Sequence, residues 1–128
     1  MVTVIIQARM GSSRLPGKIL MDLAGKPSLY HVYHRSAAAS QVDKVVIATS
    51  VSPEDDQVEA FCRLFDIECF RGSENDVLDR FYQAALNAGA SKGDVIVRIT
   101  GDCPVIDPEI LDDVVYGLEG GEFDYCSN

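Results

Sequence analysis

The feature that most constrains the fold is the alternation of short, mostly apolar segments with segments of helical periodicity. The apolar segments at 2–7, 44–50 and 94–100 show little alternation of apolar with polar residues, and shorter strands are predicted at 67–70 and 123–127. Such strands are buried on both faces, as in parallel sheets covered by helices. The pattern therefore predicts a single α/β domain in which a mostly parallel sheet lies between two layers of helices.

Helix-start signals separate these strands. The segment Ser-Pro-Glu-Asp at 52–55 forms a capping box with proline at the first helical position, and Pro27 and Pro108 mark two further starts. A fourth helix starts after Ser73 and stops at Gly89. The helices after Ser73 and Pro108 are expected to bury the apolar residues Val77, Leu78, Phe81, Ala85, Ile110, Leu111, Val114, Val115 and Leu118.

Polar segments follow the carboxyl ends of three predicted strands. The loop at 8–18 follows the first strand, Thr49 and Ser50 end the second, and Asp102 follows the strand at 94–100. Parallel sheets bind their ligands beyond the carboxyl ends of the strands. We therefore expect these segments to meet at one edge of the sheet and to form a site there.

The loop at 8–18 reads ARMGSSRLPGK and has the composition of a phosphate-binding loop. Gly11 lets the backbone turn sharply and approach a ligand closely. The other candidates supply hydroxyls, N–H groups and positive charges for phosphate oxygens, and they are Arg9, Ser12, Ser13, Arg14 and Lys18. Because these cations flank a glycine directly after a buried strand, we predict a polyphosphate site rather than a solvated surface loop.

This loop differs from the two common nucleotide-binding fingerprints. In a Walker A loop four residues separate the glycines, whereas five separate Gly11 from Gly17, and Ile19 replaces the magnesium-binding hydroxyl residue. The sequence also has no G-x-G-x-x-G motif. These differences argue against a nucleotide kinase and against an NAD-dependent enzyme.

Charge is distributed unevenly along the chain. The net charge is −9, but residues 1–35 carry five basic residues and one acidic residue. Nucleic-acid binding requires a basic surface, so the overall charge argues against a nucleic-acid partner. A local cationic segment in an acidic chain instead favours a small anionic ligand.

The cysteines and the apolar segments indicate the cellular compartment. None of the four cysteines forms a C-x-x-C pair and none is near the two histidines in the sequence, which argues against a zinc site. Cys62, Cys69 and Cys126 are expected to be buried, reduced thiols. The sequence shows no signal peptide and no apolar run of about eighteen residues. We therefore expect a cytoplasmic protein without a membrane segment.

Several motifs together resemble one family. The segment IIQARMGSSRLPGK at 5–18 resembles the first signature of the cytidylyltransferases that activate acidic sugars such as Kdo and sialic acid, and it is most similar to the spore coat polysaccharide biosynthesis type. RITGDCPVIDPEILD at 98–112, RGSENDVLDRFYQAA at 71–85 and DYCSN at 124–128 resemble further segments of that family. The resemblance implies a Rossmann-like fold with one nucleotide-binding domain over 1–128. It also implies transfer of a CMP group from CTP to a sugar, dependent on Mg²⁺, with release of pyrophosphate for glycan synthesis.

The resemblance also implies roles for individual residues. The backbone near Ala8 and Arg9 would meet the base and the ribose, and Ser12, Arg14 and Lys18 would hold the triphosphate. Arg14 and Lys18 would be the catalytic cations, because fixed positive charge stabilises the negative charge that develops on phosphoryl oxygens.

Acidic residues of the second motif have separate expected roles. Asp102 matches the family's magnesium-binding aspartate, although an aspartate that follows Gly101 also suits a turn. Asp107 is expected to cap the last helix, and Asp112 and Asp113 are expected to lie on its solvated face.

Three further residues complete the predicted nucleotide site. Asp79 and Arg80 match a pair near the sugar and base pocket, and Thr100 stands where some family members have glutamine. The full candidate set for the nucleotide is Ala8, Arg9, Gly11, Ser12, Ser13, Arg14, Lys18, Thr49, Asp79, Arg80 and Thr100.

Family members continue past the segment that ends at Asn128. Their later half brings a second metal-binding aspartate, much of the sugar pocket and the arm that builds a homodimer. We therefore expect this chain to be the N-terminal part of a longer cytidylyltransferase domain. Two alternatives stay open: a non-catalytic nucleotide-binding α/β module, and a domain related to nucleotide-sugar glycosyltransferases, which usually show a D-x-D motif that is not found here at a strand end.

Overall fold

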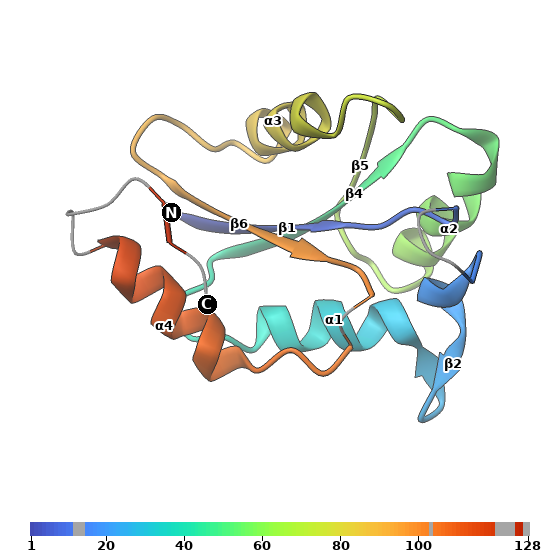
Figure 1. Ribbon diagram of the computed structural model, residues 1–128, viewed down its shortest axis with the longest axis horizontal. Helices are drawn as coiled ribbons and strands as arrows, with labels where there is room; N and C mark the ends of the chain where they lie inside the picture. The colour runs from blue at the N-terminus through green and yellow to red at the C-terminus, as the bar shows by residue number, and fades with distance from the viewer. Residues whose placement is uncertain (12–14, 103, 120–124, 127–128) are drawn as a thin grey trace.

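A parallel four-stranded sheet forms the centre of the molecule (Figure 1). The computed structural model describes residues 1–11, 15–102, 104–119 and 125–126. The strands lie in the order β5-β4-β1-β6, and they are β1 (Val2–Gln7), β4 (Lys44–Ser50), β5 (Cys69–Gly72) and β6 (Val95–Thr100). Every neighbouring pair is parallel, so all four strands end at the same edge. The predicted α/β fold is confirmed.

Helices cover both faces of this sheet (Figure 1). Helix α3 (Val77–Asn87) lies on one face, and α1 (Ser28–Ala37) and α4 (Pro108–Glu119) lie on the other. Helix α2 (Asp56–Leu64) follows the 3₁₀ turn η2 (Pro53–Asp55) and packs into the same core as α1. The turn η1 (Lys18–Leu20) and a small hairpin of β2 (Asp22–Leu23) and β3 (Lys26–Pro27) connect β1 to α1. Within the described residues, no helix is long and apolar enough to cross a membrane.

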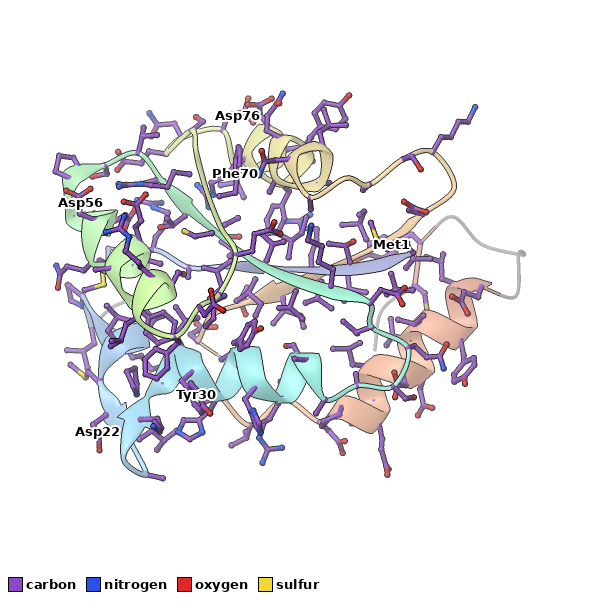
Figure 2. All side chains as sticks on the ribbon, turned by 180° about the vertical axis from the view of Figure 1, so that it is seen from behind. Met1, Asp22, Tyr30, Asp56, Phe70 and Asp76 are labelled. Carbon is purple, nitrogen blue, oxygen red and sulfur yellow. The ribbon has the colours of Figure 1, made fainter. Side chains whose placement is uncertain are left out.

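The central strand β1 is apolar throughout because it contributes to two cores. Val4 and Ile6 join the larger core with α1, α2 and α4, whereas Ile5 joins a smaller core with Phe81 and Ala84 of α3. Figure 2 shows Phe70 of β5 on the α3 side, where it packs against the smaller core. Burial on both faces explains the lack of alternation in the sequence of β1.

Strand β6 differs from the expectation of burial on both faces. Its residues alternate in exposure, with Ile96, Arg98 and Thr100 on the exposed face. Helix α3 contacts β1, β4 and β5, and it reaches the side chains of β6 chiefly where Arg98 lies over the ring of Phe81, 4.3 Å from its centre. An apolar sequence therefore does not guarantee a second covering layer at the edge of a sheet.

Several details of the predicted elements are wrong. The inward face of α3 carries Arg80 and Ala84, and Leu78 is 73% exposed, because the helix faces the sheet about one residue further round than expected. Ile110 is also exposed in α4. The strand predicted at 67–70 lies at Cys69–Gly72, and the β2–β3 hairpin was not expected. The predicted strand at 123–127 falls mostly outside the described residues.

The cysteines only partly match their expectation. Cys62, Cys69 and Cys126 are free thiols, but only Cys62 is fully buried and the other two are half-buried. A side-chain hydrogen bond between Cys62 and Cys69 raises the pKa of Cys62, and burial raises it further. The same hydrogen bond lowers the pKa of Cys69.

Candidate functional site

The loop after β1 is closed at its base by backbone hydrogen bonds. Ala8 is buried and its N–H donates to the carbonyl of Ala48, which holds the start of the loop against β4. The N–H of Gly17 donates to the carbonyl of Met10 at 2.8 Å, and the N–H of Lys18 donates to Leu15. We call the Met10–Gly17 pair the loop neck. The predicted residues Ser12, Ser13 and Arg14 lie between these positions, outside the described residues.

Glycine is required at the far side of the neck. Gly17 has a φ of 77°, in the left-handed region that L side chains rarely adopt. Lys18 follows it as the exposed first residue of η1, and Ile19 anchors that turn in the core. The neck thus places the exposed residue Lys18 at the base of the loop, whereas Gly11 lies exposed on the loop itself.

The end of β6 lies directly against the end of β1. Thr100 pairs with Gln7 in the sheet, and the N–H of Gly101 donates to the carbonyl of Gln7 at 2.8 Å. A Cβ atom on Gly101 would lie 2.9 Å from that carbonyl and 3.3 Å from the Cβ of Ala8. This close approach allows only glycine and brings the exposed Asp102 to the edge of the sheet where the loop begins.

The donor set at this edge fits a partly hydrated magnesium ion. Among the described residues no three His, Cys, Asp or Glu side chains form a cluster that could enclose a metal. Mg²⁺ prefers one or two carboxylates together with water and substrate phosphates. The exposed carboxylate of Asp102, at the edge of the sheet where the loop begins, matches that preference.

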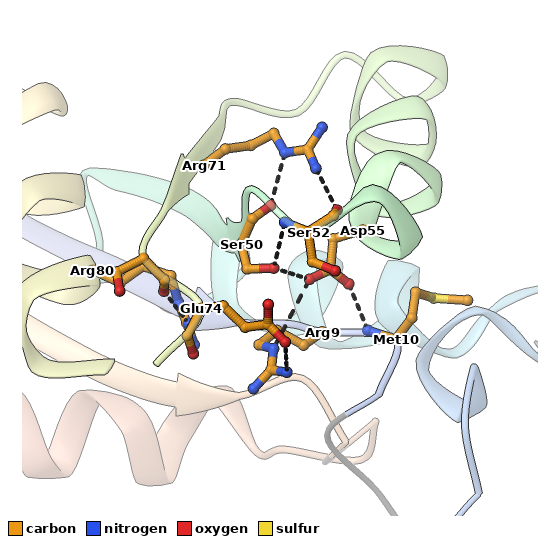
Figure 3. A network of polar contacts seen from close by, with 9 residues as sticks. Arg9, Met10, Ser50, Ser52, Asp55, Arg71, Glu74 and Arg80 are labelled. Carbon is orange, nitrogen blue, oxygen red and sulfur yellow. Dashed lines mark hydrogen bonds and ion pairs between the residues drawn. The ribbon is translucent and has the colours of Figure 1, made fainter. Parts of the chain in front are cut away.

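A buried carboxylate lies behind the loop (Figure 3). Asp55, at the end of η2, is 0% exposed, and its Oδ1 accepts a hydrogen bond of 2.8 Å from the N–H of Met10. Its Oδ2 accepts a hydrogen bond from the hydroxyl of Ser50 and lies 3.9 Å from Nε of Arg9. The guanidinium of Arg9 also pairs with Glu74 at 3.3 Å. Arg9 therefore lies between two carboxylates from different elements.

Arg80 brings a second guanidinium to this region. Its side chain is fully buried, Nη1 donates to the carbonyl of Ser73 at 2.8 Å, and Nε and Nη2 have no hydrogen-bond partner within the described structure. Burial lowers the pKa of Arg80, as does the nearby charge of Arg9, while Asp55 opposes the shift. Buried N–H donors without a partner are rare, and a bound ligand is one explanation for them.

Arg71 fastens the segment that carries Asp55. From β5 its guanidinium donates to the carbonyls of Ser50 and Ser52, both at 2.8 Å, and pairs with Asp56 at 2.7 Å. The hydrogen bond to Asp56 raises the pKa of Arg71. Figure 2 shows Asp56 at the outer surface of the molecule, in contrast to the buried Asp55.

The structure brings some of the predicted residues together and separates others. Ala8, Arg9, Lys18, Thr100 and Asp102 lie at or beside the carboxyl edge of the sheet, as expected.

Two of the other predicted residues are placed differently. Asp79 is exposed in the first turn of α3, where its N–H donates to Asp76, so it diverges from its buried neighbour Arg80. Thr49 is fully buried at the end of β4, and its hydroxyl has no hydrogen-bond partner among the described residues.

Sequence reasoning missed Asp55, Glu74 and Arg71. The acidic run 54–56 was read as a helix start, and Asp55 as part of a capping box. Ser52 makes no capping bond with its side chain, since the N–H of Asp55 donates to the Ser52 carbonyl, and the carboxylate of Asp55 is directed to the loop. A usable signal was present: Asp55 precedes the buried Val58 and Cys62 by three and seven residues, the spacing of one helix face.

A family model described as "Cytidylyltransferase" matches residues 3–128. The chain belongs to the cytidylyltransferase family. Its relatives include the spore coat polysaccharide biosynthesis protein SpsF of Bacillus subtilis, with 44% identity over 99% of this chain and 54% of that protein. The resemblance stated from the motifs is therefore confirmed.

Solved cytidylyltransferase structures have the same fold. A cytidylyltransferase from Leptospira borgpetersenii superposes with a TM-score of 0.84 at 36% identity, over 94% of this chain and 50% of that one. A CMP:2-keto-3-deoxy-manno-octonic acid synthetase complexed with CTP superposes with a TM-score of 0.80 at 30% identity, over 94% of this chain and 48% of that one. The chain spans about half the length of the relatives it matches.

Proposed function

We propose that the carboxyl edge of the sheet binds CTP, and that the protein transfers its CMP group to a sugar used in glycan synthesis. The observation that carries this proposal is the packing of Gly101 against Gln7 and Ala8, which brings Asp102 to the edge of the sheet where the cation-bearing loop begins. The similarity to a synthetase solved with CTP supports the choice of nucleotide. We further propose that residues 1–128 form one nucleotide-binding domain.

The loop would hold the triphosphate. Lys18, beside the neck, supplies a mobile positive charge, and the proposal assigns Ser12, Ser13 and Arg14 to the same phosphates from their place in the first motif. Gly11 would offer its backbone without a side chain, at a position where a Cβ atom would lie 2.8 Å from Oε1 of Glu54. Arg14 and Lys18 would stabilise the negative charge of the transition state, since fixed cations aimed at phosphoryl oxygens lower the barrier.

The base and ribose would lie beyond the carboxyl ends of β1 and β6. The backbone of Ala8 and Arg9, together with Thr100, lies at this edge, and Arg80, whose charge lies near Arg9, is assigned to the same region from its motif. Thr49 is assigned to the surroundings of the nucleotide by its place at the end of its strand, and Asp79 by the sequence motif.

The reaction would be a substitution at the α-phosphorus. A sugar hydroxyl forms a bond to that phosphorus, the bond to the bridging oxygen breaks, and pyrophosphate leaves as the hydroxyl proton passes to solvent or to a base. Asp102 would hold Mg²⁺, which when bound neutralises charge on phosphate oxygens. The residues of this chain bind and orient the triphosphate, which aligns it for attack.

Calorimetric titration of the chain with CTP, ATP, GTP and UTP, with and without Mg²⁺, tests the proposal. We expect CTP to bind most tightly and only with Mg²⁺. Asp102→Asn should weaken that binding by about tenfold or more, because the charged metal ligand is lost. The matched control is Asp113→Asn, an exposed carboxylate on α4. Absence of nucleotide binding, or equal binding by the Asp102 variant, would contradict the proposal.

An assay for pyrophosphate release with candidate sugars separates the enzyme from a binding module. Release that requires both CTP and a sugar supports the transferase. Tight CTP binding without release under all acceptor conditions supports the non-catalytic nucleotide-binding module instead.

A further inference from the structure

We infer that Asp55 is a positioning residue that fixes the phosphate-binding loop and Arg9 for the nucleotide. The inference rests on the proposed function and adds a residue that neither the motifs nor the comparisons point to. Asp55 lies on η2 and does not belong to the loop, so it acts through the groups that it holds (Figure 3).

The carboxylate of Asp55 is directed to the loop rather than to its own helix. It is fully buried and makes no capping hydrogen bond to α2, although it occupies the N-cap position of that helix. Oδ1 instead accepts from Met10 N–H at 2.8 Å, across 45 residues of sequence. A buried carboxylate that serves only a helix end would bond to that helix, so its orientation indicates a role at the loop.

Both backbone polar groups of Met10 take part in hydrogen bonds. Its N–H donates to Asp55, and its carbonyl accepts from Gly17 to close the loop neck. Asp55 therefore connects the start of α2 to Met10, the residue at which the two ends of the loop meet. Without this carboxylate, the neck would keep its internal bond and the attachments of Ala8 and Ile19, but Met10 would lose its bond to the start of α2.

Asp55 also limits the orientation of Arg9. The guanidinium has a carboxylate on each side, Asp55 at 3.9 Å and Glu74 at 3.3 Å, and Arg80 carries a further positive charge nearby. Repulsion between the two guanidiniums would drive them apart in the absence of the buried carboxylate. Asp55 thereby keeps both cations at the edge where we propose that CTP binds.

The test compares variants that remove the hydrogen bond between Asp55 and Met10 with variants that leave this bond in place. Asp55→Ala removes the acceptor, whereas Asp55→Asn retains a carbonyl oxygen of the same reach for the Met10 N–H. Ser50→Ala disturbs the same buried carboxylate but leaves the bond to Met10. Asp56→Asn is the exposed neighbour and the matched control. Each chain is titrated with Mg²⁺–CTP, its thermal unfolding is recorded, and the exchange rate of the Met10 amide is measured by NMR.

We expect Asp55→Ala to weaken CTP binding and to accelerate Met10 amide exchange by about tenfold or more each, since a hydrogen bond to a charged group is lost. Asp55→Asn should lie between Asp55→Ala and the unaltered chain in CTP affinity, because it keeps the acceptor for Met10 but loses the charge beside Arg9. Ser50→Ala and Asp56→Asn should stay within about threefold of the unaltered chain. If Asp55→Ala does not fold, Asp55→Ser, whose hydroxyl is too short for Met10, replaces it.

Three results would overturn the inference. One is unchanged CTP affinity in a folded Asp55→Ala chain, and another is equal loss in Ser50→Ala, which would indicate a merely structural role. The third is a Met10 amide that exchanges as fast as an exposed loop amide in the unaltered chain. Failure of the proposed function is recognised separately, because the unaltered chain would then bind no CTP while its Met10 amide stays protected.

Discussion

At the scale of single residues, buried charge is the property that distinguishes this site. Asp55 and Arg80 are both fully buried. Both carboxylate oxygens of Asp55 accept hydrogen bonds, whereas Nε and Nη2 of Arg80 have no hydrogen-bond partner among the described residues. A guanidinium with unpartnered N–H groups contributes little to folding, because it loses its hydration without full compensation. Arg80 is therefore expected to contribute little to stability, and its place at the nucleotide site remains a proposal that a substitution tests.

Arg80→Met separates these two roles. Methionine has a similar volume and no charge to desolvate, so we expect the free energy of unfolding to change by no more than about 1 kcal/mol. CTP affinity should fall by about tenfold or more, as the N–H donors are removed. Urea unfolding and calorimetry measure the two effects, with the exposed Arg63→Met as the control. A large loss of stability with unchanged CTP affinity would assign Arg80 to the fold instead.

At the scale of elements, side chains that bridge segments hold the framework of the site. Asp112 of α4 was expected on a solvated face, but it is half-buried and accepts hydrogen bonds from the N–H groups of Ser40 and Gln41 at 3.0 and 2.8 Å. It thus ties α4 to the segment that follows α1, just as Arg71 ties β5 to the turn before α2. Burial raises the pKa of Asp112, but the bonds from Gln41 and Ser40 lower it more, and the net shift is downward.

The lowered pKa of Asp112 predicts how stability depends on pH. A carboxyl whose pKa is lower in the folded chain stabilises the fold above its unfolded pKa of about 3.9, and this contribution is lost as pH falls through the folded value. Asp112→Asn should therefore destabilise the chain at pH 7 and show a smaller further loss between about pH 5 and pH 2. Urea unfolding across this range, with Asp113→Asn as the control, measures the difference. Parallel acid profiles for the Asp112 variant and the unaltered chain would exclude this contribution.

The strands and helices also show how much of the fold and of the site could be predicted from the sequence. Periodicity and caps predicted β1 and β4 to the residue, because strands buried on both faces and flanked by helix starts leave few alternatives. The placement of Ala8, Arg9 and Asp102 at one edge followed from strand direction alone. The partners of Arg9 could not be found in this way, because Asp55 and Glu74 reach it across 46 and 65 residues through tertiary packing. The sequence did not predict the inward position of Arg80, because charged residues are rarely buried on the inner face of a helix.

At the scale of the whole molecule, a chain with a net charge of −9 is proposed to bind an anion. Interactions between exposed charges are screened beyond about 10 Å at 0.1 M salt. The cations at the loop should therefore dominate over acidic groups elsewhere on the surface. The local charge near the ligand, rather than the total, sets the electrostatic contribution to binding.

The salt dependence of CTP affinity tests this balance. We expect affinity to fall by about threefold or more between 0.05 and 0.5 M NaCl, because attraction to nearby cations is screened. Calorimetry at several salt concentrations and constant free Mg²⁺ measures the slope, and titration with cytidine, which carries no phosphate, gives the control. An affinity that rises with salt would show that repulsion by the acidic surface prevails.

The strand order has a consequence for how the chain folds during synthesis. Strand β1 is made first and pairs along one edge with β4, but its other edge waits for β6, and the N-terminal amine reaches Asp94 only then. Contacts this distant in sequence form slowly, and the unpaired edge of an apolar strand is prone to aggregation in the meantime. The final pairing of β6 also sets Gly101 against Gln7, so the edge of the sheet that carries Asp102 is complete only after the last of the four sheet strands has been synthesised.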